Sequence, residues 1–460
     1  MNFDRRAIAA PTRELANWVA GLSYDDLPQR TREVVRIALL DTVGAGIYGY
    51  RTPWAQMLLA WAKRGAAASG EAHVWGEAAA ALRSADAALV NGTAAHAFEV
   101  DDYHNAKLHP GAVVVPAALA VAERLNCSGT ELVTAIAAGY EVMIRSSLAL
   151  NPSAARLRGW HLTGVCGPFG AAAACASLLK LNAEQTAWAL GLAGTQGAGL
   201  WAFNADGTMS KRLHPGKAAH SGVLAAELAQ LGFSGPTQIY EFADGGVLKA
   251  FSDASDAAPL TQDLGAIYHL DQTSIKPYAC CGSTHSYIDA ALALRKKLGA
   301  PWDASRRVRA GTAKVVDVQC GFDYVPSSAL NAQMSLRYTV AVALIEGQAL
   351  PAQFADAKLA DPTITGLAGA IELVPDPRLD KLYPKDFAGW VAAEHNGEWL
   401  RVDIMNPSGS VHAPIDSRGV TEKFRGINPG LDADSIASAA LSIEQHSARG
   451  FIELLNRAPR

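Results

Sequence analysis

Apolar residues recur at helical spacing over most of the first 260 positions. At 31–47 they form a broad stripe of period 3.6, which predicts an amphipathic helix. Two capping sequences, Ser128-Gly-Thr-Glu and Asn182-Ala-Glu-Gln, predict helix starts, because such a side chain can accept from the backbone three residues later. Ser84 is predicted to cap another helix, and 215–231 is again amphipathic. This part of the chain is therefore expected to be helix after helix.

The pattern changes near residue 265. Alternating β-branched residues predict strands at 307–319 and 399–404, with a helix at 335–346 between them. Helical patterns then return at 432–440 and 442–455. We therefore expect a mainly α protein whose helical part is built from both ends of the chain.

The length supports two domains, because 460 residues exceed what one compact core usually holds. The expected helical domain comprises 1–265 and 407–460, and the expected inserted α+β domain comprises 266–406. A third small unit at the C-terminal return is the alternative.

Composition narrows the class of protein. Hydrophobic residues make up 50% and charged residues 18%, with a net charge of −4, which is typical of a well-buried globular protein. No basic stripe is present, so nucleic acid is not an expected partner. The apolar runs fall short of a membrane span, and the first six residues lack a signal-type apolar core. Six scattered cysteines suggest free thiols in the cytoplasm.

Four polar islands interrupt the apolar segments, at 96–111, 159–164, 206–216 and 274–285. The first carries three histidines and three carboxylates in sixteen residues. Each island has a structural alternative. The carboxylates of the first island are also typical of a solvated helix end. His161 is also typical of a buried or helix-capping histidine, and Lys211 and Arg212 of a charged surface. The neighbouring Cys280 and Cys281 suit buried packing.

Together the islands favour a site for a small polyanion. Lys211, Arg212 and Lys276 can hold carboxylates, and histidines can move protons near neutral pH. A cleft between the two domains is the expected place for such a site. His104 and Asp102 could form a metal pair, but two ligands in a turn are weak evidence.

No cofactor is expected. The letters Gly44-Ala-Gly-Ile-Tyr-Gly match a dinucleotide-binding pattern, but no strand precedes them, so they predict helix packing. Walker, zinc-protease and nucleophile-elbow motifs are absent from the sequence. Lys276 could form a Schiff base, yet no phosphate cup for pyridoxal phosphate is recognisable. Acid–base chemistry by the protein's own groups is therefore favoured.

At these residues the sequence resembles the MmgE/PrpD family, which includes 2-methylcitrate dehydratase, cis-aconitate decarboxylase and iminodisuccinate epimerase. The resemblance covers nearly the whole chain. It is carried by Leu40-Asp-Thr-Val-Gly, Asn91-Gly-Thr-Ala-Ala-His-Ala, Asp101-Asp with His109-Pro-Gly, Ser210-Lys-Arg-Leu-His-Pro-Gly and Lys276-Pro-Tyr-Ala-Cys-Cys. It implies a large helical domain, a smaller α+β lid, an active site between them and a homodimer.

The resemblance also implies site residues. The family's histidines fall on His109 and His161, and its lysines on Lys211 and Lys276. Three positions differ from the decarboxylase branch, which has aspartate, threonine and histidine where this chain has Glu99, Tyr103 and Cys281. The expected catalytic residues are His109, His161, Lys211, Lys276 and Glu99. The expected substrate-binding residues are Asp102, Tyr103, His104, Arg212 and Cys281.

The chemistry shared by the family makes or quenches a carbanion beside a carboxylate. Cations must stabilise that charge, a role expected of Lys211, Arg212 and Lys276. His109 and His161 are expected to move the proton, with Glu99 or Asp102 orienting one of them. His96 is expected to be structural.

A hydro-lyase resembling 2-methylcitrate dehydratase is the first expectation for the reaction. An iminodisuccinate-type epimerase, a cis-aconitate-type decarboxylase and an inactive carboxylate-binding homologue are the alternatives.

Overall fold

The computed structural model describes residues 10–65, 70–206, 208–383 and 386–457, and it is 59% helical. The first nine residues, for which no signal-type core was expected, lie outside this part. The chain divides into two compact units. The helical unit comprises Met1–Ala97, Asp101–Thr273 and Val420–Arg460, and the α+β unit comprises Phe98–Val100 and Ser274–Gly419. The expected boundaries therefore shift: 266–273 belong to the helical unit, whereas 98–100 and 407–419 belong to the α+β unit.

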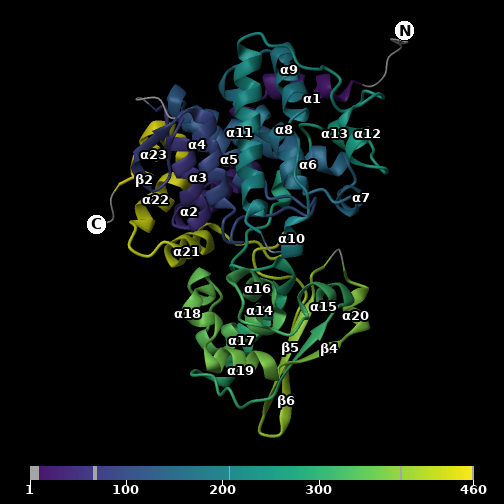
Figure 1. The fold of residues 1–460 in the computed structure, drawn as a ribbon, viewed down its shortest axis with the longest axis vertical. Coiled ribbons are helices and arrows are strands. Elements are labelled where there is room, and N and C mark those ends of the chain that lie inside the picture. The colour runs from purple at the N-terminus through teal and green to yellow at the C-terminus, as the bar shows by residue number, and fades with distance from the viewer. Residues whose placement is uncertain (1–9, 66–69, 207, 384–385, 458–460) are drawn as a thin grey trace. The chain divides into compact units, whose positions relative to one another are not determined.

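Helices of very different length build the helical unit (Figure 1). They are α1 (Pro11–Gly21), α2 (Gln29–Tyr50), α3 (Pro53–Lys63), α4 (Ser84–Ala95), α5 (Gly111–Leu125), α6 (Gly129–Ala149), α7 (Pro152–Leu157), α8 (Leu162–Leu178), α9 (Ala183–Gly194), α10 (Phe203–Asp206), α11 (Ser210–Gln230), α12 (Val247–Phe251) and α13 (Ala258–Thr261). After the α+β unit come α21 (Ser417–Ile427), α22 (Ala433–Leu441) and α23 (Ala448–Leu455).

Small residues let the central helices approach closely. Helix α8 packs against α5, α6 and α11. A Cβ atom on Gly139 of α6 would lie 2.8 Å from the carbonyl oxygen of Gly170 in α8. One on Gly222 of α11 would lie 2.3 Å from the Cβ of Ala171. Larger side chains at these glycines would force the helices apart, since protein cores are close-packed. Close packing brings the N-terminal ends of α5, α8 and α11 within reach of one another.

Both capping sequences are confirmed. Ser128 Oγ accepts a hydrogen bond from the backbone of Glu131, whose carboxylate accepts one from the backbone of Ser128. Asn182 and Gln185 form the same reciprocal pair at the start of α9. Each box satisfies two amides that the first helical turn leaves without partners.

Other predicted boundaries are wrong. Ser84 is the first residue of α4 and does not cap it, because Arg83 holds the capping position. Helix α11 begins at Ser210 and contains Pro215, which we had placed at its start. The stretch 442–455 is broken before α23, because the Ser447 side chain accepts from the Gly450 amide and starts a new helix.

The sequence patterns did not predict a short β-hairpin. Strands β1 (Ala72–Val74) and β2 (Glu77–Leu82) pair antiparallel, although the alanines of β2 favour a helix by propensity. Pairing with a neighbouring strand, a tertiary interaction, overrides that preference here.

The glycines at 44–49 pack helices, as predicted. They lie within α2, and a Cβ on Gly44 would meet the ring of Phe424, while one on Gly46 would meet Trp75. No strand precedes them among the described residues, so the dinucleotide-binding interpretation has no structural support.

The α+β unit is built on a four-stranded sheet of order β4-β3-β5-β6. Its strands are β3 (Val308–Thr312), β4 (Glu372–Pro375), β5 (Gly389–His395) and β6 (Glu398–Ile404). The β3–β4 pair is parallel and the other two pairs are antiparallel. Helix α14 (His285–Leu298) packs on β5 and β6 and contacts α17 (Leu336–Glu346). Shorter helices complete the unit: α15 (Lys314–Cys320), α16 (Ala329–Met334), α18 (Asp356–Leu359), α19 (Pro362–Ala370) and α20 (Pro377–Asp380).

The predicted strand at 307–319 is correct only in its first half. The chain turns at Ala313 into α15, where the backbone amide of Lys314 donates to Asp380 at 2.7 Å. Strand β6 and helix α17 agree with prediction, and Ser335 caps α17 by accepting from the Tyr338 amide. Alternation alone did not reveal where pairing in the sheet stops.

Helix α6 is long and apolar enough to cross a membrane by length and composition. However, 94% of its most apolar window is buried inside the protein, which is typical of a core helix. It is the single helix among the described residues that meets this criterion.

Candidate functional site

The expected site residues fall into two groups, one in each unit. His109, His161, Lys211 and Arg212 belong to the helical unit, together with Asp102, Tyr103 and His104. Glu99, Lys276 and Cys281 belong to the α+β unit, because segment 98–100 is part of it.

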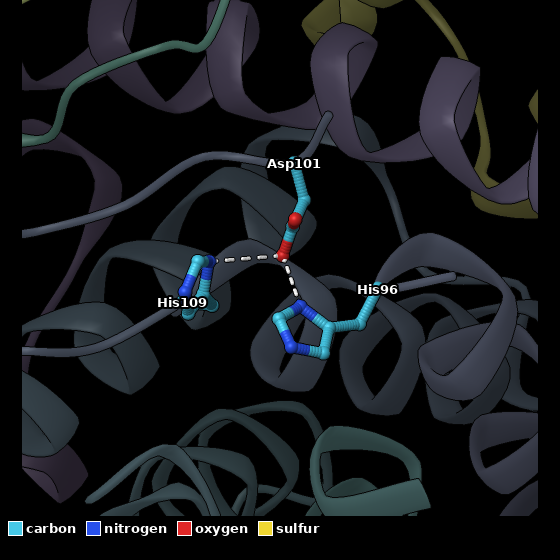
Figure 2. Close-up of side chains that lie close together, drawn as sticks. All are labelled: His96, Asp101 and His109. Atoms are coloured by element: carbon cyan, nitrogen blue, oxygen red, sulfur yellow. Dashed lines mark hydrogen bonds and ion pairs between the residues drawn. The ribbon is translucent and has the colours of Figure 1, made fainter. Parts of the chain in front are cut away.

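Two imidazoles share one carboxylate oxygen at the centre of the helical-unit group (Figure 2). Asp101 Oδ2 lies 2.7 Å from Nδ1 of His96 and 3.2 Å from Nδ1 of His109. His109 Nδ1 also lies 2.9 Å from the carbonyl oxygen of Asp102. Because both of its contacts are acceptors, His109 carries its proton on Nδ1 and leaves Nε2 free to exchange one. His109 is the more accessible ring, with 16% of its side chain exposed, whereas the His96 side chain is fully buried.

The two neighbouring aspartates have opposite electrostatics. Burial by itself would raise the pKa of Asp101, but the imidazoles of His96 and His109 lower it well below the usual value. Burial, and then the charge of Asp101, raises the pKa of Asp102 to about 8. Asp101 is therefore the charged partner of the histidines, and Asp102 is protonated at neutral pH.

Asp102 is a structural residue in this geometry. One oxygen accepts from the Gly111 amide at 2.9 Å, and the other lies 2.7 Å from the Tyr140 hydroxyl. The side chain is completely buried. Our expectation that it binds substrate does not match this placement. It anchors the loop that carries His109 and orients that ring through its backbone carbonyl.

His104 is also engaged locally. Its Nδ1 accepts from the Ala106 amide at 3.0 Å, and burial lowers its pKa to about 4. With Asp102 bound elsewhere, the metal pair considered from the sequence does not form. Tyr103 is half-buried.

Another set of possible metal ligands is His96, Asp101 and His109, whose ligand atoms lie within 4.8 Å of one another. Here both Nδ1 atoms already lie at hydrogen-bond distance from the same oxygen, so we interpret the set as a hydrogen-bonded triad.

Three helix N-termini converge on this cluster. His109 and Pro110 precede α5, His161 holds the capping position of α8, and Lys211 lies in the first turn of α11. The backbone amide of His109 donates to Thr163 of α8 at 3.2 Å, which links the first two ends. The rings of His96 and His161 are 6.2 Å apart. Helix N-termini carry partial positive charge and unsatisfied amides, so their convergence creates a setting for an anion.

His161 and His214 connect α8 to α11. Their Nδ1 atoms are 2.8 Å apart, and both rings contact Phe203. Burial, followed by the charges of His96 and Lys211, lowers the pKa of His161 well below its usual value. His161 is therefore neutral at physiological pH, and the Lys211 ammonium lies near enough to influence it.

Arg212 is nearly buried and bound to the protein itself. Its guanidinium donates to the carbonyl oxygens of Ala97 and Thr208, both at 3.4 Å, and lies over the Trp54 ring. Lys211 has a less enclosed position, with its ammonium 6.0 Å from the Phe203 ring centroid. Of the two cations, Lys211 is better placed to meet a ligand.

The α+β-unit group is a buried ion pair beside thiols. Lys276 Nζ lies 2.9 Å from Glu99 Oε2, with 4% and 7% of the two side chains exposed. Glu99 adopts a φ of 57°, a conformation that is uncommon for residues other than glycine. Gln333 fixes this segment by donating to the carbonyl oxygens of Phe98 and Ala279. A hydrogen bond from Cys320 lowers the pKa of the Cys281 thiol below its usual value.

Sequence reasoning missed three important side chains. Asp101 and His214 were quoted within motifs without a role, and His96 was expected to be only structural. The adjacent pair Asp101-Asp102 offered no sign of which carboxylate would face the histidines. His214 follows Lys211 by three positions, which is one turn of a helix. This spacing could have indicated that the two side chains lie on the same face.

Comparisons with known proteins agree with the resemblance. The MmgE/PrpD N-terminal domain matches residues 13–260, and the MmgE/PrpD C-terminal domain matches residues 278–447. A cis-aconitate decarboxylase of Aspergillus terreus is 30% identical over 480 residues, covering 98% of this chain and 97% of that protein. A cis-aconitate decarboxylase of Homo sapiens is 30% identical over 377 residues, covering 80% of this chain and 77% of that protein. The chain belongs to the MmgE/PrpD family.

Proposed function

We propose that this chain is a lyase that decarboxylates a small unsaturated tricarboxylate resembling cis-aconitate, using its own acid–base groups. The observation that carries the proposal is the convergence of three helix N-termini on His109, His161 and Lys211. Such a setting favours a polycarboxylate. The named decarboxylase relatives support this reaction over the dehydration that we had placed first.

The residues suit the two halves of a decarboxylation. When the C–C bond to the leaving carboxylate breaks, CO₂ departs. The electron pair of that bond stays on the substrate and spreads over the remaining conjugated carboxylate. The Lys211 ammonium and the helix N-termini stabilise that charge. A proton then adds to carbon, and the proposed donor is Nε2–H of His109 in its doubly protonated form, whose Nδ1–H is held by Asp101 and the Asp102 carbonyl. After donation, solvent returns a proton to Nε2. Lys276 is proposed as a further carboxylate-binding cation, with Glu99 as its counter-charge.

Dehydration of a 2-methylcitrate-like acid is the second candidate. The resemblance implies three departures from the decarboxylase branch, at Glu99, Tyr103 and Cys281, and these leave dehydration open. The Glu99 carboxylate already neutralises Lys276.

A substrate panel tests the proposal. The purified protein is incubated in D₂O with cis-aconitate, 2-methylcitrate, citrate and iminodisuccinate, and products are followed by NMR. We expect loss of CO₂ from cis-aconitate and one deuterium in the product at the carbon that receives the proton. His109→Gln removes the proposed donor, and His104→Gln is the matched control in the same loop.

If 2-methylcitrate is the one acid of the panel that is turned over, dehydration replaces decarboxylation as the proposed reaction. Binding without turnover of any acid would support an inactive homologue.

A further inference from the structure

Two imidazoles face each other through the same kind of atom at the N-terminal ends of α8 and α11. His161 Nδ1 lies 2.8 Å from His214 Nδ1, with ring centroids 5.1 Å apart. Only one hydrogen fits between two nitrogens at this distance, so one ring donates and the other accepts. The protonation of one ring therefore dictates the tautomer of the other.

The backbone around the pair leaves room for this contact. A Cβ on Gly199, whose φ is 145°, would lie 3.3 Å from His214 Nδ1. A Cβ on Gly164 would lie 3.3 Å from the Cβ of His214. Trp201 and Phe203 contact the His161 ring edge-on, at centroid distances of 5.7 and 5.5 Å. The two rings are therefore packed closely against the surrounding backbone and aromatic side chains.

The surroundings decide which ring donates. His161 is 3% exposed and lies at the N-terminal end of α8, so burial and the positive end of the helix both oppose a second proton on it. His214 is half-buried, and burial followed by Lys211 lowers its pKa less severely. When the pair takes up an extra proton, His214 receives it and must then donate from Nδ1.

We propose that His214 is a positioning residue, which donates its Nδ1–H to His161 and thereby holds the His161 proton on Nε2. In this tautomer His161 is a neutral hydrogen-bond donor, and a carboxylate oxygen of the substrate is its natural acceptor. The opposite tautomer would present a lone pair to an anion and repel it. The identity of the acceptor rests on the proposed function, whereas the tautomer is a property of the free protein.

An isosteric pair of substitutions tests the direction of the bond. In His214→Asn the side-chain amide keeps a donor near the position of Nδ1. In His214→Asp the carboxylate offers only acceptors, so it should draw the His161 proton to Nδ1. His220→Asn, on the same helix, is the control for losing an imidazole from α11.

Long-range ¹H–¹⁵N correlation spectra of the full-length protein with ¹⁵N-labelled histidine identify the protonated ring nitrogen. The spectrum of His161→Asn assigns the His161 signals. We expect Nε2–H in the wild type and in His214→Asn, and Nδ1–H in His214→Asp. The pH series should also follow Lys211, His96 and His109 as neighbours, because the charges of all three act on His161.

Turnover provides the second measurement. We expect kcat of His214→Asp to fall about 10-fold or more below that of His214→Asn, since an acid–base or donor group in the wrong state loses much of its contribution. His220→Asn should retain the wild-type kcat.

A proton on Nδ1 of His161 in the wild type, or identical His161 tautomers in the Asn and Asp variants, would overturn the proposal. If the Asp variant does not fold, the wild-type spectrum still decides. Absence of turnover by the wild type on every acid of the panel would overturn the proposed function, and the tautomer result would stand by itself.

Discussion

The imidazole cluster of the helical unit and the Lys276–Glu99 pair of the α+β unit are both buried, yet their charges are balanced in different ways. In the cluster, His96 and His109 contact a single ionised carboxylate, Asp101, and His161 and His214 contact each other. In the pair, one full positive charge meets one full negative charge at 2.9 Å. The cluster therefore offers imidazoles as proton carriers next to one fixed charge, whereas removing either charge of the pair should destabilise the α+β unit.

The same contrast occurs on a smaller scale between Asp101 and Asp102. Both are completely buried, but only Asp101 faces two imidazoles. Asp102 faces a hydroxyl and one amide, and its pKa rises to about 8. Burial by itself does not determine ionisation, because the partners that replace water decide it.

Removing one charge from the α+β-unit pair should have the largest effect. Glu99→Gln leaves Lys276 buried without its counter-charge, and we expect the free energy of unfolding to fall by about 3–5 kcal/mol. Urea unfolding measures it. The control is Glu394→Gln, which breaks the more exposed pair with Arg307 in the same unit and should cost about 1 kcal/mol or less. Equal losses in the two variants would contradict the interpretation of Glu99.

Removing the cation at the start of α11 should mainly affect turnover. We expect Lys211→Ala to lower kcat/KM about 10²-fold or more, because it removes stabilisation of the developing carboxylate charge. Lys217→Ala, on the same helix, is the matched control, since its ammonium bonds to Ser221. The comparison between the two regions would fail if Lys211→Ala unfolded the protein as severely as Glu99→Gln.

Neutralising the shared carboxylate should act through His109. Asp101→Asn keeps the size of the side chain but replaces one acceptor oxygen by a donor, which conflicts with the Nδ1–H of a histidine. We expect kcat to fall about 10-fold or more and the pH dependence of kcat to change shape. Steady-state rates between pH 5 and 9 measure both. An unchanged pH profile would remove Asp101 from the proposed mechanism.

The last expected effect is a pH dependence of stability that comes from Asp102. Its pKa is raised from 3.8 to about 8 in the folded protein, so the folded state binds more protons than the unfolded state between these values. The contribution of Asp102 to stability is therefore fully present below pH 3.8 and is lost as the pH rises through about 8. We expect Asp102→Asn to remove a slope of about 1 kcal/mol per pH unit across this window. Urea unfolding of the two proteins at several pH values provides the test, and parallel curves would argue against a protonated Asp102.

Local signals allowed much of the fold to be predicted. The capping boxes at Ser128 and Asn182 and the apolar stripe of α2 depend on residues that are close in sequence. They can therefore be recognised without knowing the tertiary structure. Strand β2 was missed because hairpin pairing with β1 overrides the helix propensity of its alanines, and helix α15 was missed because contact with Asp380 decides where β3 ends. The helical spacing of apolar residues in α22 and α23 predicts that the chain returns to the helical unit at its C-terminal end.

The sequence by itself determined the family, the mainly α class and the residue types available for chemistry, because motifs and periodicity are properties of the chain in order. Only the tertiary structure decided which of two adjacent aspartates holds the histidines, since the two side chains are chemically identical and consecutive in sequence. It also brought His214 to His161 across 53 positions and placed Glu99 against Lys276 across 177. Hydrogen bonds and ion pairs act over a few ångströms, so these roles become visible only when distant segments have packed together.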